Sequence, residues 1–204
     1  MCGMRFYSLI LAAALALPAC ATPTTEPERL PAGQWRLDPA HTSVTWRVRH
    51  MGLSWYTARF DTVEAVLDFD PGAPEGASLT VLIDPRSIST GDPEFDRELA
   101  EDWFHAGRYP QIRFVSNTVR ATGENRGVVA GSLSMNGHEA SVEIDTVFNG
   151  GLTNILEGRE AIGFSASATL DRTEFGIGNL PQTIIGRNMH ILIESEFLLE
   201  GDRP

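Results

Sequence analysis

The sequence contains no lysine, only two cysteines and no long hydrophobic run. All 16 basic residues are arginine, which excludes Schiff-base chemistry on a lysine amine. Both cysteines, Cys2 and Cys20, lie near the N-terminus, so no disulfide can stabilise the rest of the chain. The net charge of −11 disfavours binding to nucleic acids and to anionic membrane surfaces. A chain of 204 residues must therefore rely on one sizeable core, which suits a single domain.

The longest apolar run, residues 9–16, has the layout of a secretory signal peptide. Arg5 precedes it and small residues follow it. A membrane-spanning helix needs roughly 20 apolar residues, so this run predicts export and no span. We expect a signal peptide at residues 1–19, and Met4 is an alternative start to Met1.

Two modes of processing fit the residues around Cys20. The stretch 17–20, Leu-Pro-Ala-Cys, resembles a lipoprotein box, in which the cysteine is lipidated and becomes the mature N-terminus. The stretch 19–21, Ala-Cys-Ala, equally satisfies the small-x-small rule of ordinary signal peptidase. We favour lipidation because Cys20 begins a segment, 20–33, with the composition of a tether. The prediction is a periplasmic protein anchored to the membrane as a lipoprotein, with a soluble exported protein as the alternative.

Beyond the tether, at residues 34–200, apolar and polar residues alternate with a period of two between turn signals. This pattern is typical of antiparallel strands with one dry face. In the first strand, Val44, Trp46 and Val48 alternate with threonine and arginine. In the second, residues 58–69, the alternation slips by one near Asp61, which predicts a bulge. The other expected strands are 79–83, 112–120, 128–135, 140–148, 161–170 and 190–199.

Two local signals add a turn and a helix to these strands. The pair Asn136-Gly137 predicts a tight hairpin. Asp92 can cap a short helix whose apolar face holds Phe95, Leu99 and Trp103, and this helix can cover one end of a barrel. Eight antiparallel strands with one helix predict an all-β fold, either a sandwich or an up-and-down barrel just wide enough for one small ligand.

Four stretches, in order, cover nearly the whole predicted domain. They are Trp35-Arg36-Leu37-Asp38-Pro39-Ala40-His41-Thr42-Ser43; Ser87-Ile88-Ser89-Thr90-Gly91 with Phe95-Asp96-Arg97-Glu98-Leu99, Asp102-Trp103-Phe104 and Tyr109-Pro110-Gln111-Ile112-Arg113-Phe114; Gly131-Ser132-Leu133-Ser134-Met135-Asn136-Gly137; and Leu170-Asp171-Arg172-Thr173-Glu174-Phe175-Gly176-Ile177. Together they resemble the YceI-like family of bacterial lipid-binding proteins. The resemblance implies a lipocalin-like, eight-stranded antiparallel up-and-down barrel that receives a polyisoprenoid chain, such as a prenyl diphosphate or a quinone tail. It also implies a periplasmic setting and frequent homodimers.

The sequence departs from the family's pattern at three aromatic or polar positions. Trp46 and Trp103 stand where members more often carry phenylalanine, and His105 replaces a more usual aspartate. The two larger aromatic side chains could shorten or reshape a cavity. The length of the bound lipid is therefore left open by the resemblance.

A lipid-binding barrel needs an apolar lining and a few polar groups at one mouth. His50 continues the inward frame of the first strand and could bond a headgroup, or it is a structural histidine. Arg172 could pair with a diphosphate, although Asp171 and Glu174 compete for its guanidinium group. The same inward side chains could instead pack a filled core. The candidate lipid-binding residues are Trp46, Val48, His50, Phe60, Phe114, Met135, Phe148, Phe164 and Arg172.

Motifs for catalysis and metal binding are incomplete. Residues 163–167 lack the last glycine of a nucleophile elbow, His138-Glu139 lacks the second histidine of a zinc helix, and the acidic stretch from Asp92 fails as a calcium loop. We therefore expect no enzyme, no metal and no cofactor. Two alternatives stay open: a small hydrolase or isomerase that uses His50 or His41 in the same cavity, and a barrel without a ligand that acts through protein contacts.

Overall fold

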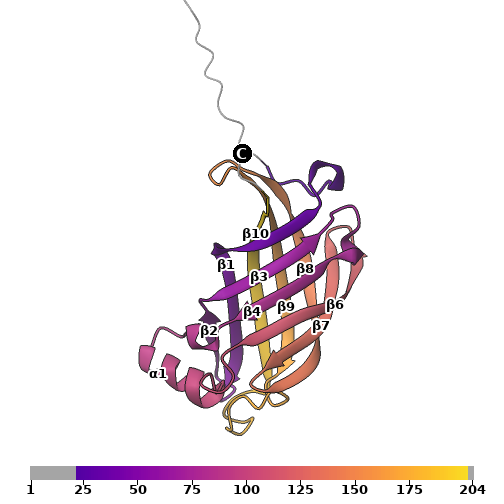
Figure 1. Cartoon of the computed structure of the whole chain (residues 1–204). Coiled ribbons are helices and arrows are strands. Elements are labelled where there is room, and N and C mark those ends of the chain that lie inside the picture. The colour runs from indigo at the N-terminus through magenta and orange to yellow at the C-terminus, as the bar shows by residue number, and fades with distance from the viewer. Residues whose placement is uncertain (1–21, 202–204) are drawn as a thin grey trace, which may run out of the picture.

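The computed structural model describes residues 22–201, and their strands form a closed barrel (Figure 1). The predicted signal peptide and Cys20 lie outside the described residues. All strand pairings in the barrel sheet are antiparallel. The strands are β1 (Gly33–His50), β2 (Ser54–Phe60), β3 (Val63–Phe69), β4 (Ser78–Ile83), β5 (Ile88–Ser89), β6 (Ile112–Gly123), β7 (Arg126–Met135), β8 (His138–Asn154), β9 (Arg159–Asp171) and β10 (Asn188–Leu199).

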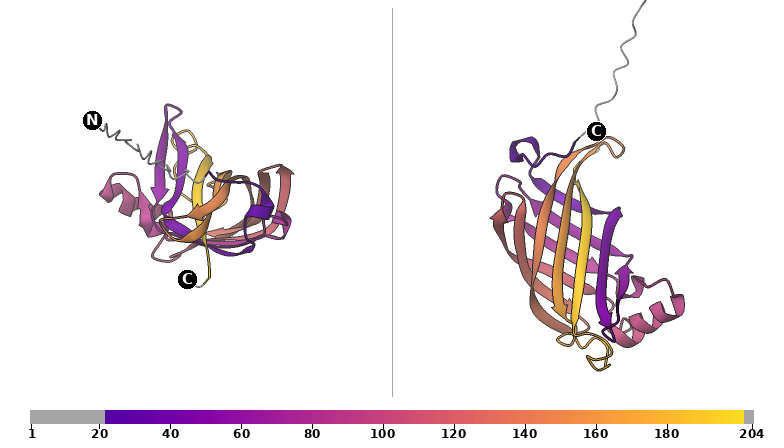
Figure 2. Two further views of the ribbon diagram at one scale, coloured as in Figure 1. Left: turned by 90° about the horizontal axis from the view of Figure 1, so that it is seen from above. Right: turned by 180° about the vertical axis from the view of Figure 1, so that it is seen from behind.

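Eight of these strands make the barrel wall, in the order β1, β3, β4, β6, β7, β8, β9 and β10. The barrel closes because β10 pairs with β1. The two remaining strands extend the sheet beside β1: β2 pairs with β1, and the short β5 pairs with β2. Seen from above, the strands surround a common centre (Figure 2). The predicted eight-stranded antiparallel up-and-down barrel is therefore confirmed, and the alternative of a sandwich is wrong.

Strand β1 is longer than the sequence pattern indicated. The expected first strand, around Val44 to Val48, is only the second half of a strand that begins at Gly33. Between the halves, the pairing of β1 with β10 shifts at Asp38 and Ser43. The chain thus bulges at the polar and proline-containing residues of this stretch, which interrupt the alternation of buried and exposed side chains.

The expected bulge near Asp61 is wrong, because the chain breaks its strand there. Strand β2 ends at Phe60 and β3 begins at Val63. The slip in the alternation is real, since Phe60 and Ala65 are both buried although they belong to different frames. The break allows β2 and β3 to pair with opposite halves of β1, on either side of the irregularity in β1.

The predicted hairpin at Asn136-Gly137 joins β7 to β8. Both residues have positive φ, 53° and 76°, as a tight turn of this kind requires. The Asn136 side chain donates hydrogen bonds to the Phe175 and Gly176 carbonyls, at 2.9 and 3.2 Å, and its Oδ1 lies 2.7 Å from His105 Nδ1. The hairpin is therefore joined to two segments that are distant in the sequence.

The expected helix forms between β5 and β6. It consists of α1 (Pro93–Glu98) and a π-helical turn, η4 (Leu99–Trp103). Asp92 caps α1, because its Oδ1 accepts hydrogen bonds from the backbone N–H groups of Glu94 and Phe95. Leu99 is fully buried. None of the helices within residues 22–201 is long and apolar enough to cross a membrane.

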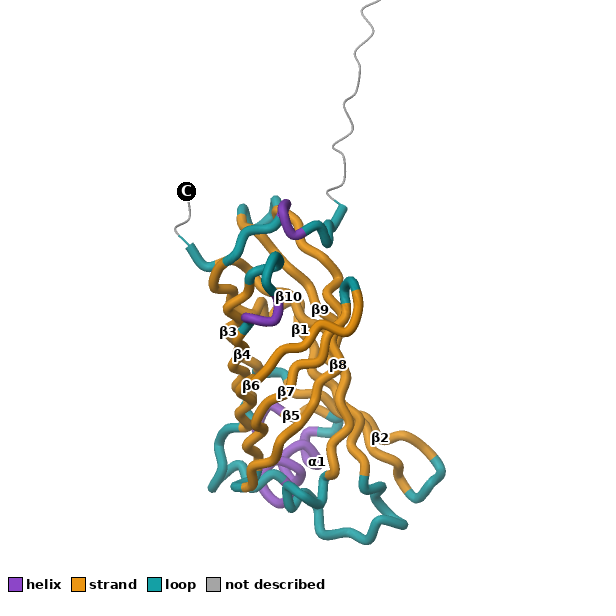
Figure 3. Tube along the Cα trace, turned by 90° about the vertical axis from the view of Figure 1, so that its right-hand side faces the viewer, coloured by secondary structure: helices purple, strands orange, loops and turns teal. Residues whose placement is uncertain are grey.

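The described part of the expected tether packs against the barrel instead of forming a free linker. Thr24 and Gly151 exchange two backbone hydrogen bonds of 2.8 Å each. The chain then forms the short turn η1 (Pro27–Arg29) and buries Leu30 before β1 begins. Helix α1 lies at one end of the barrel, and short helical turns lie toward the other end (Figure 3).

Candidate functional site

The barrel encloses a cavity with a volume of about 310 Å³, and all eight wall strands contribute side chains to it. The lining is almost entirely apolar. Many inward side chains, such as Val142 and Ile144 of β8, pack against the buried core on one side and line the cavity on the other, so they are only half-buried. The volume lies at the lower end of the range of roughly 300–1000 Å³ that is typical of ligand pockets.

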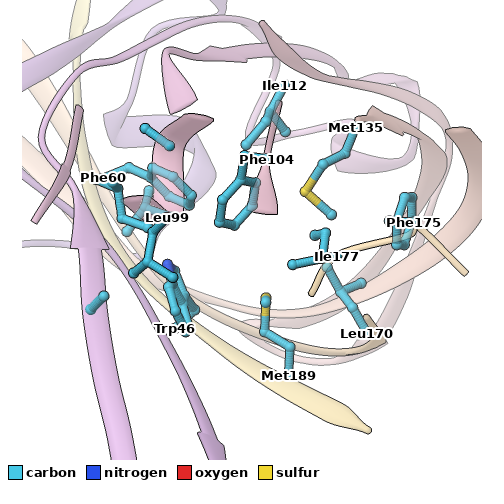
Figure 4. Close-up of a cluster of buried hydrophobic side chains, with 14 of the residues drawn as sticks. Trp46, Phe60, Leu99, Phe104, Ile112, Met135, Leu170, Phe175, Ile177 and Met189 are labelled. Atoms are coloured by element: carbon cyan, nitrogen blue, oxygen red, sulfur yellow. The ribbon is translucent and has the colours of Figure 1, made fainter. Parts of the chain in front are cut away.

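The two ends of the cavity differ. The mouth is formed by Thr25 and Pro27 of the N-terminal segment, Pro71 and Pro74 after β3, and residues 124–126, which make the turn after β6 and the first residue of β7. These residues bring the polar groups of Glu124, Asn125 and Arg126 to the opening. The floor is apolar and includes Trp46, Phe104, Met135, Leu170 and Met189, whose side chains point toward a common centre (Figure 4).

Behind the floor, the barrel interior is packed. Segments outside the wall supply much of the filling: Leu99 and Phe104 follow α1, while Phe175 and Ile177 come from the connection between β9 and β10. Each of these four side chains is at most 2% exposed. This end of the barrel is therefore sealed, and an elongated ligand can enter the cavity only from the mouth.

Arg172 organises the connection that seals the barrel. Its guanidinium group donates five hydrogen bonds of 2.7–2.9 Å, all to backbone carbonyls. Burial lowers the pKa of Arg172 from its usual value. Its neighbour Asp171 pairs with Arg187 instead. Arg172 thus has no donor left for the diphosphate that the sequence suggested. The five acceptors are the carbonyl oxygens of Ile177, Gly178, Leu180, Ile185 and Gly186.

The structure brings six of the nine candidate residues together around the cavity: Trp46, Phe60, Phe114, Met135, Phe148 and Phe164. The other three lie elsewhere. Val48 packs in the sealed end, and His50 ends β1 and bridges to Ile185. Arg172 is held by the carbonyls described above.

Sequence reasoning missed the groups at the mouth and the small side chains that leave the cavity open. Ala166 and Ala168 of β9 face the cavity in the same frame as Phe164. Small residues in an inward frame were the available signal for open space. The role of Thr25 and Pro27 had no signal, because it depends on the docking of the N-terminal segment on the barrel.

His41 lies on the outside of the barrel, at the bulge of β1. Its Nδ1 is 2.8 Å from Asp38 Oδ2, and Asp38 Oδ1 accepts a hydrogen bond from the Ala40 N–H. Ligand atoms of Asp38, His41 and Glu196 lie within 4.8 Å of one another, so this group is the one that could hold a metal among the described residues. His41 does not reach the cavity, and within residues 22–201 no histidine lines it.

The electrostatics of the bulge favour an ion pair. Burial alone would raise the pKa of Asp38, but hydrogen bonds from His41 and from the Ala40 N–H lower it below its usual value. The hydrogen bond to Asp38 raises the pKa of His41, and the charges of Asp38 and Glu196 act in the same direction. A charged pair therefore closes the bulge on the outer wall.

A closed eight-stranded barrel with an apolar interior and a single mouth defines the class of lipocalin-like ligand-binding barrels. Residues 35–197 match the YceI-like domain, and the chain belongs to the YceI-like family.

Relatives and solved structures agree with this membership. A UPF0312 protein of Pseudomonas putida (strain GB-1) is 31% identical over 149 residues, which cover 72% of this chain and 77% of the relative. The structure of Burkholderia cenocepacia BcnA is similar with a TM-score of 0.72 and 23% identity, over 78% of this chain and 98% of BcnA. A Campylobacter jejuni YCEI protein has a TM-score of 0.68 and 26% identity, over 75% of this chain and 90% of the other.

A fourth similar protein is a polyisoprenoid binding domain from Saccharophagus degradans, implicated in plant cell wall breakdown. The TM-score is 0.63 and the identity 13%, over 83% of this chain and all of that domain. At this identity the likeness shows a shared fold.

Proposed function

We propose that the barrel binds one long apolar lipid of the polyisoprenoid type, for transport, storage or stress protection in the cell envelope. The observation that carries this proposal is the open apolar cavity, which ends on an apolar floor and opens at one mouth. A five-carbon prenyl unit that buries about 100 Å² contributes on the order of 2.5 kcal/mol before ordering costs. Several units can therefore provide the affinity without any polar contact inside the barrel.

The lipid lies with its tail toward the floor and its polar end at the mouth. Arg126 is the cationic side chain that lines the cavity among the described residues, and it lies at the opening. A guanidinium group can pair with a phosphate or bond to a quinone oxygen. Arg126 thus takes the place that the sequence suggested for Arg172.

The test is mass spectrometry of organic extracts from the purified protein. We expect wild type to yield a prenyl lipid, and Ala168→Phe to yield less lipid or a shorter one, because the new ring occupies the cavity. Thr169→Phe is the matched control, since Thr169 is the next residue of β9 and faces outward. The proposal fails if wild type yields no lipid, or if both variants retain the wild-type lipid.

We also propose that the protein is exported and anchored through a lipidated Cys20. The support is the sequence, in which the cysteine directly follows the apolar run and small residues. Cys20→Ser should release the protein from membrane fractions or block its maturation. An intact mass that matches an unmodified chain beginning at Thr22 would contradict the anchor.

A further inference from the structure

The turn between β8 and β9 exposes two adjacent large apolar side chains. Ile155 is 83% exposed and Leu156 is 91% exposed. The chain crosses here from Asn154 to Arg159, and we call residues 155–158 the β8–β9 tip. Single exposed apolar residues are common on protein surfaces, but an adjacent pair at a protruding turn is a candidate contact with an apolar partner.

The β8–β9 tip lies at the same end of the barrel as the mouth. Gly151, just before the tip, pairs with Thr24, and the next residue, Thr25, lines the mouth. The ribbon views place this turn at the end opposite α1 and the sealed floor (Figure 1). An external surface that contacts the β8–β9 tip therefore also faces the opening of the cavity.

The N-terminal chain leaves the structure at this same end. The first described residue is Thr22, two residues before the pairing with Gly151. An anchor at Cys20 would lie two residues further out, which spans at most about 7 Å. A lipid anchor there would therefore hold the mouth and the β8–β9 tip at the bilayer, and this step rests on the proposed function.

The charges around the tip select the kind of surface. Four carboxylates lie here: Glu157 belongs to the tip, Glu160 follows it, and Glu26 and Glu28 lie on the neighbouring N-terminal segment. The same two segments carry two basic residues, Arg29 and Arg159. This excess of carboxylates disfavours an anionic membrane surface. We infer that the β8–β9 tip inserts Ile155 and Leu156 into the interface of a zwitterionic bilayer, so that lipid passes directly between the bilayer and the mouth.

The sealed end also has exposed apolar side chains, and it is the competing surface. Leu53, in the turn between β1 and β2, is 82% exposed. Nearby, Trp55 is 41% exposed, and the guanidinium groups of Arg47 and Arg49 lie 4.7 and 4.9 Å from its ring centre. Contact of this end with a bilayer would leave the mouth in water, because the packed floor separates the two ends.

Fluorescence quenching by vesicles of brominated phosphatidylcholine tests which end inserts. Leu156→Trp places a reporter at the β8–β9 tip, and Leu53→Trp places the matched reporter at the sealed end. We expect added quenching for Leu156→Trp to exceed that for Leu53→Trp by at least about twofold, because only an inserted side chain reaches the brominated acyl chains. Quenching of Leu53→Trp alone, or of neither variant, would overturn the inference.

A second measurement links insertion to lipid exchange. In the Ile155→Ser/Leu156→Ser double variant, we expect the rate of lipid transfer from phosphatidylcholine vesicles to fall by at least about fivefold, because interfacial binding scales with buried apolar area. The lipid already bound should still be recovered from the purified variant, since neither side chain lines the cavity. Unchanged transfer would overturn the inference. Quenching at the tip in a protein without extractable lipid would defeat the proposed function and leave the docking intact.

Discussion

The two halves of the barrel interior are enclosed by the same strands, yet one is hollow and the other is packed. In the packed half, side chains that follow α1 and side chains from the connection between β9 and β10 fill the space inside the wall. In the hollow half, wall residues supply most of the lining between the mouth and the floor, and small ones such as Ala166 and Ala168 keep it open. The connections between strands, and not the strands themselves, therefore decide how far the cavity extends along the barrel axis.

Replacement of Arg172 should have the largest effect on the packed half of the barrel. Arg172→Met should lower the free energy of unfolding by about 4 kcal/mol or more, because it removes five hydrogen bonds and leaves buried carbonyls without a donor. Urea unfolding would measure the loss. Arg187→Met is the control: Arg187 pairs with Asp171 at the surface, so its replacement should cost less than about 1 kcal/mol. Equal losses of stability in the two variants would show that the hydrogen bonds from Arg172 to the five carbonyls do not hold the sealed end together.

Phenylalanine inserted into each half gives the second test. Val48→Phe should lower stability by about 1–3 kcal/mol, since Val48 is buried among packed side chains. Ala168→Phe should lower the stability of lipid-free protein by less than about 1 kcal/mol, because its ring enters open space. Thermal unfolding of both delipidated variants would compare them. If Ala168→Phe lowers the stability more than Val48→Phe does, the half of the barrel next to the mouth is not hollow in solution.

The pH dependence of stability gives the smallest effect, at the bulge where the two halves of β1 meet. The lowered pKa of Asp38 stabilises the fold above its usual pKa of 3.8, and this contribution is lost as the pH falls through the lower, folded value. The raised pKa of His41 stabilises the fold fully below its usual value of 6.5, and this contribution is lost as the pH rises through the higher, folded value.

The difference in stability between wild type and His41→Asn should therefore be largest between pH 3.8 and 6.5 and should shrink on either side. Urea midpoints measured across this range would show it. A difference that does not change with pH would mean that the pair contributes packing and not charge.

The sequence predicted the wall of the barrel well, because inward and outward side chains alternate along most of its strands. It could not predict where along the barrel axis the cavity ends. Trp46 and Val48 are consecutive inward residues of one strand, yet Trp46 lines the cavity and Val48 lies in the packed half. The boundary between them is set by Phe104 and other side chains whose positions depend on contacts with distant parts of the chain.

The role of Arg172 could not be predicted for a related reason. The sequence shows only the neighbouring carboxylates of Asp171 and Glu174, which suggested an ion pair or a free guanidinium group. Its acceptors are backbone carbonyls of an irregular connection, and such carbonyls leave no mark in the amino-acid types. The helix and the Asn136-Gly137 hairpin were predictable because each depends on the local backbone preferences of a few adjacent residues.

The pairing of β1 with β10 also has a consequence for the order of folding. The first and the last of the described strands, β1 and β10, share one of the longest ladders in the barrel, so closure must wait until β10 has been delivered. Contacts between distant parts of a chain form slowly, which favours folding in milliseconds to seconds. Until β10 arrives, β1 and β9 each present an unpaired edge to other chains. The emerging chain is therefore most prone to aggregation in the interval between the completion of β9 and the docking of β10.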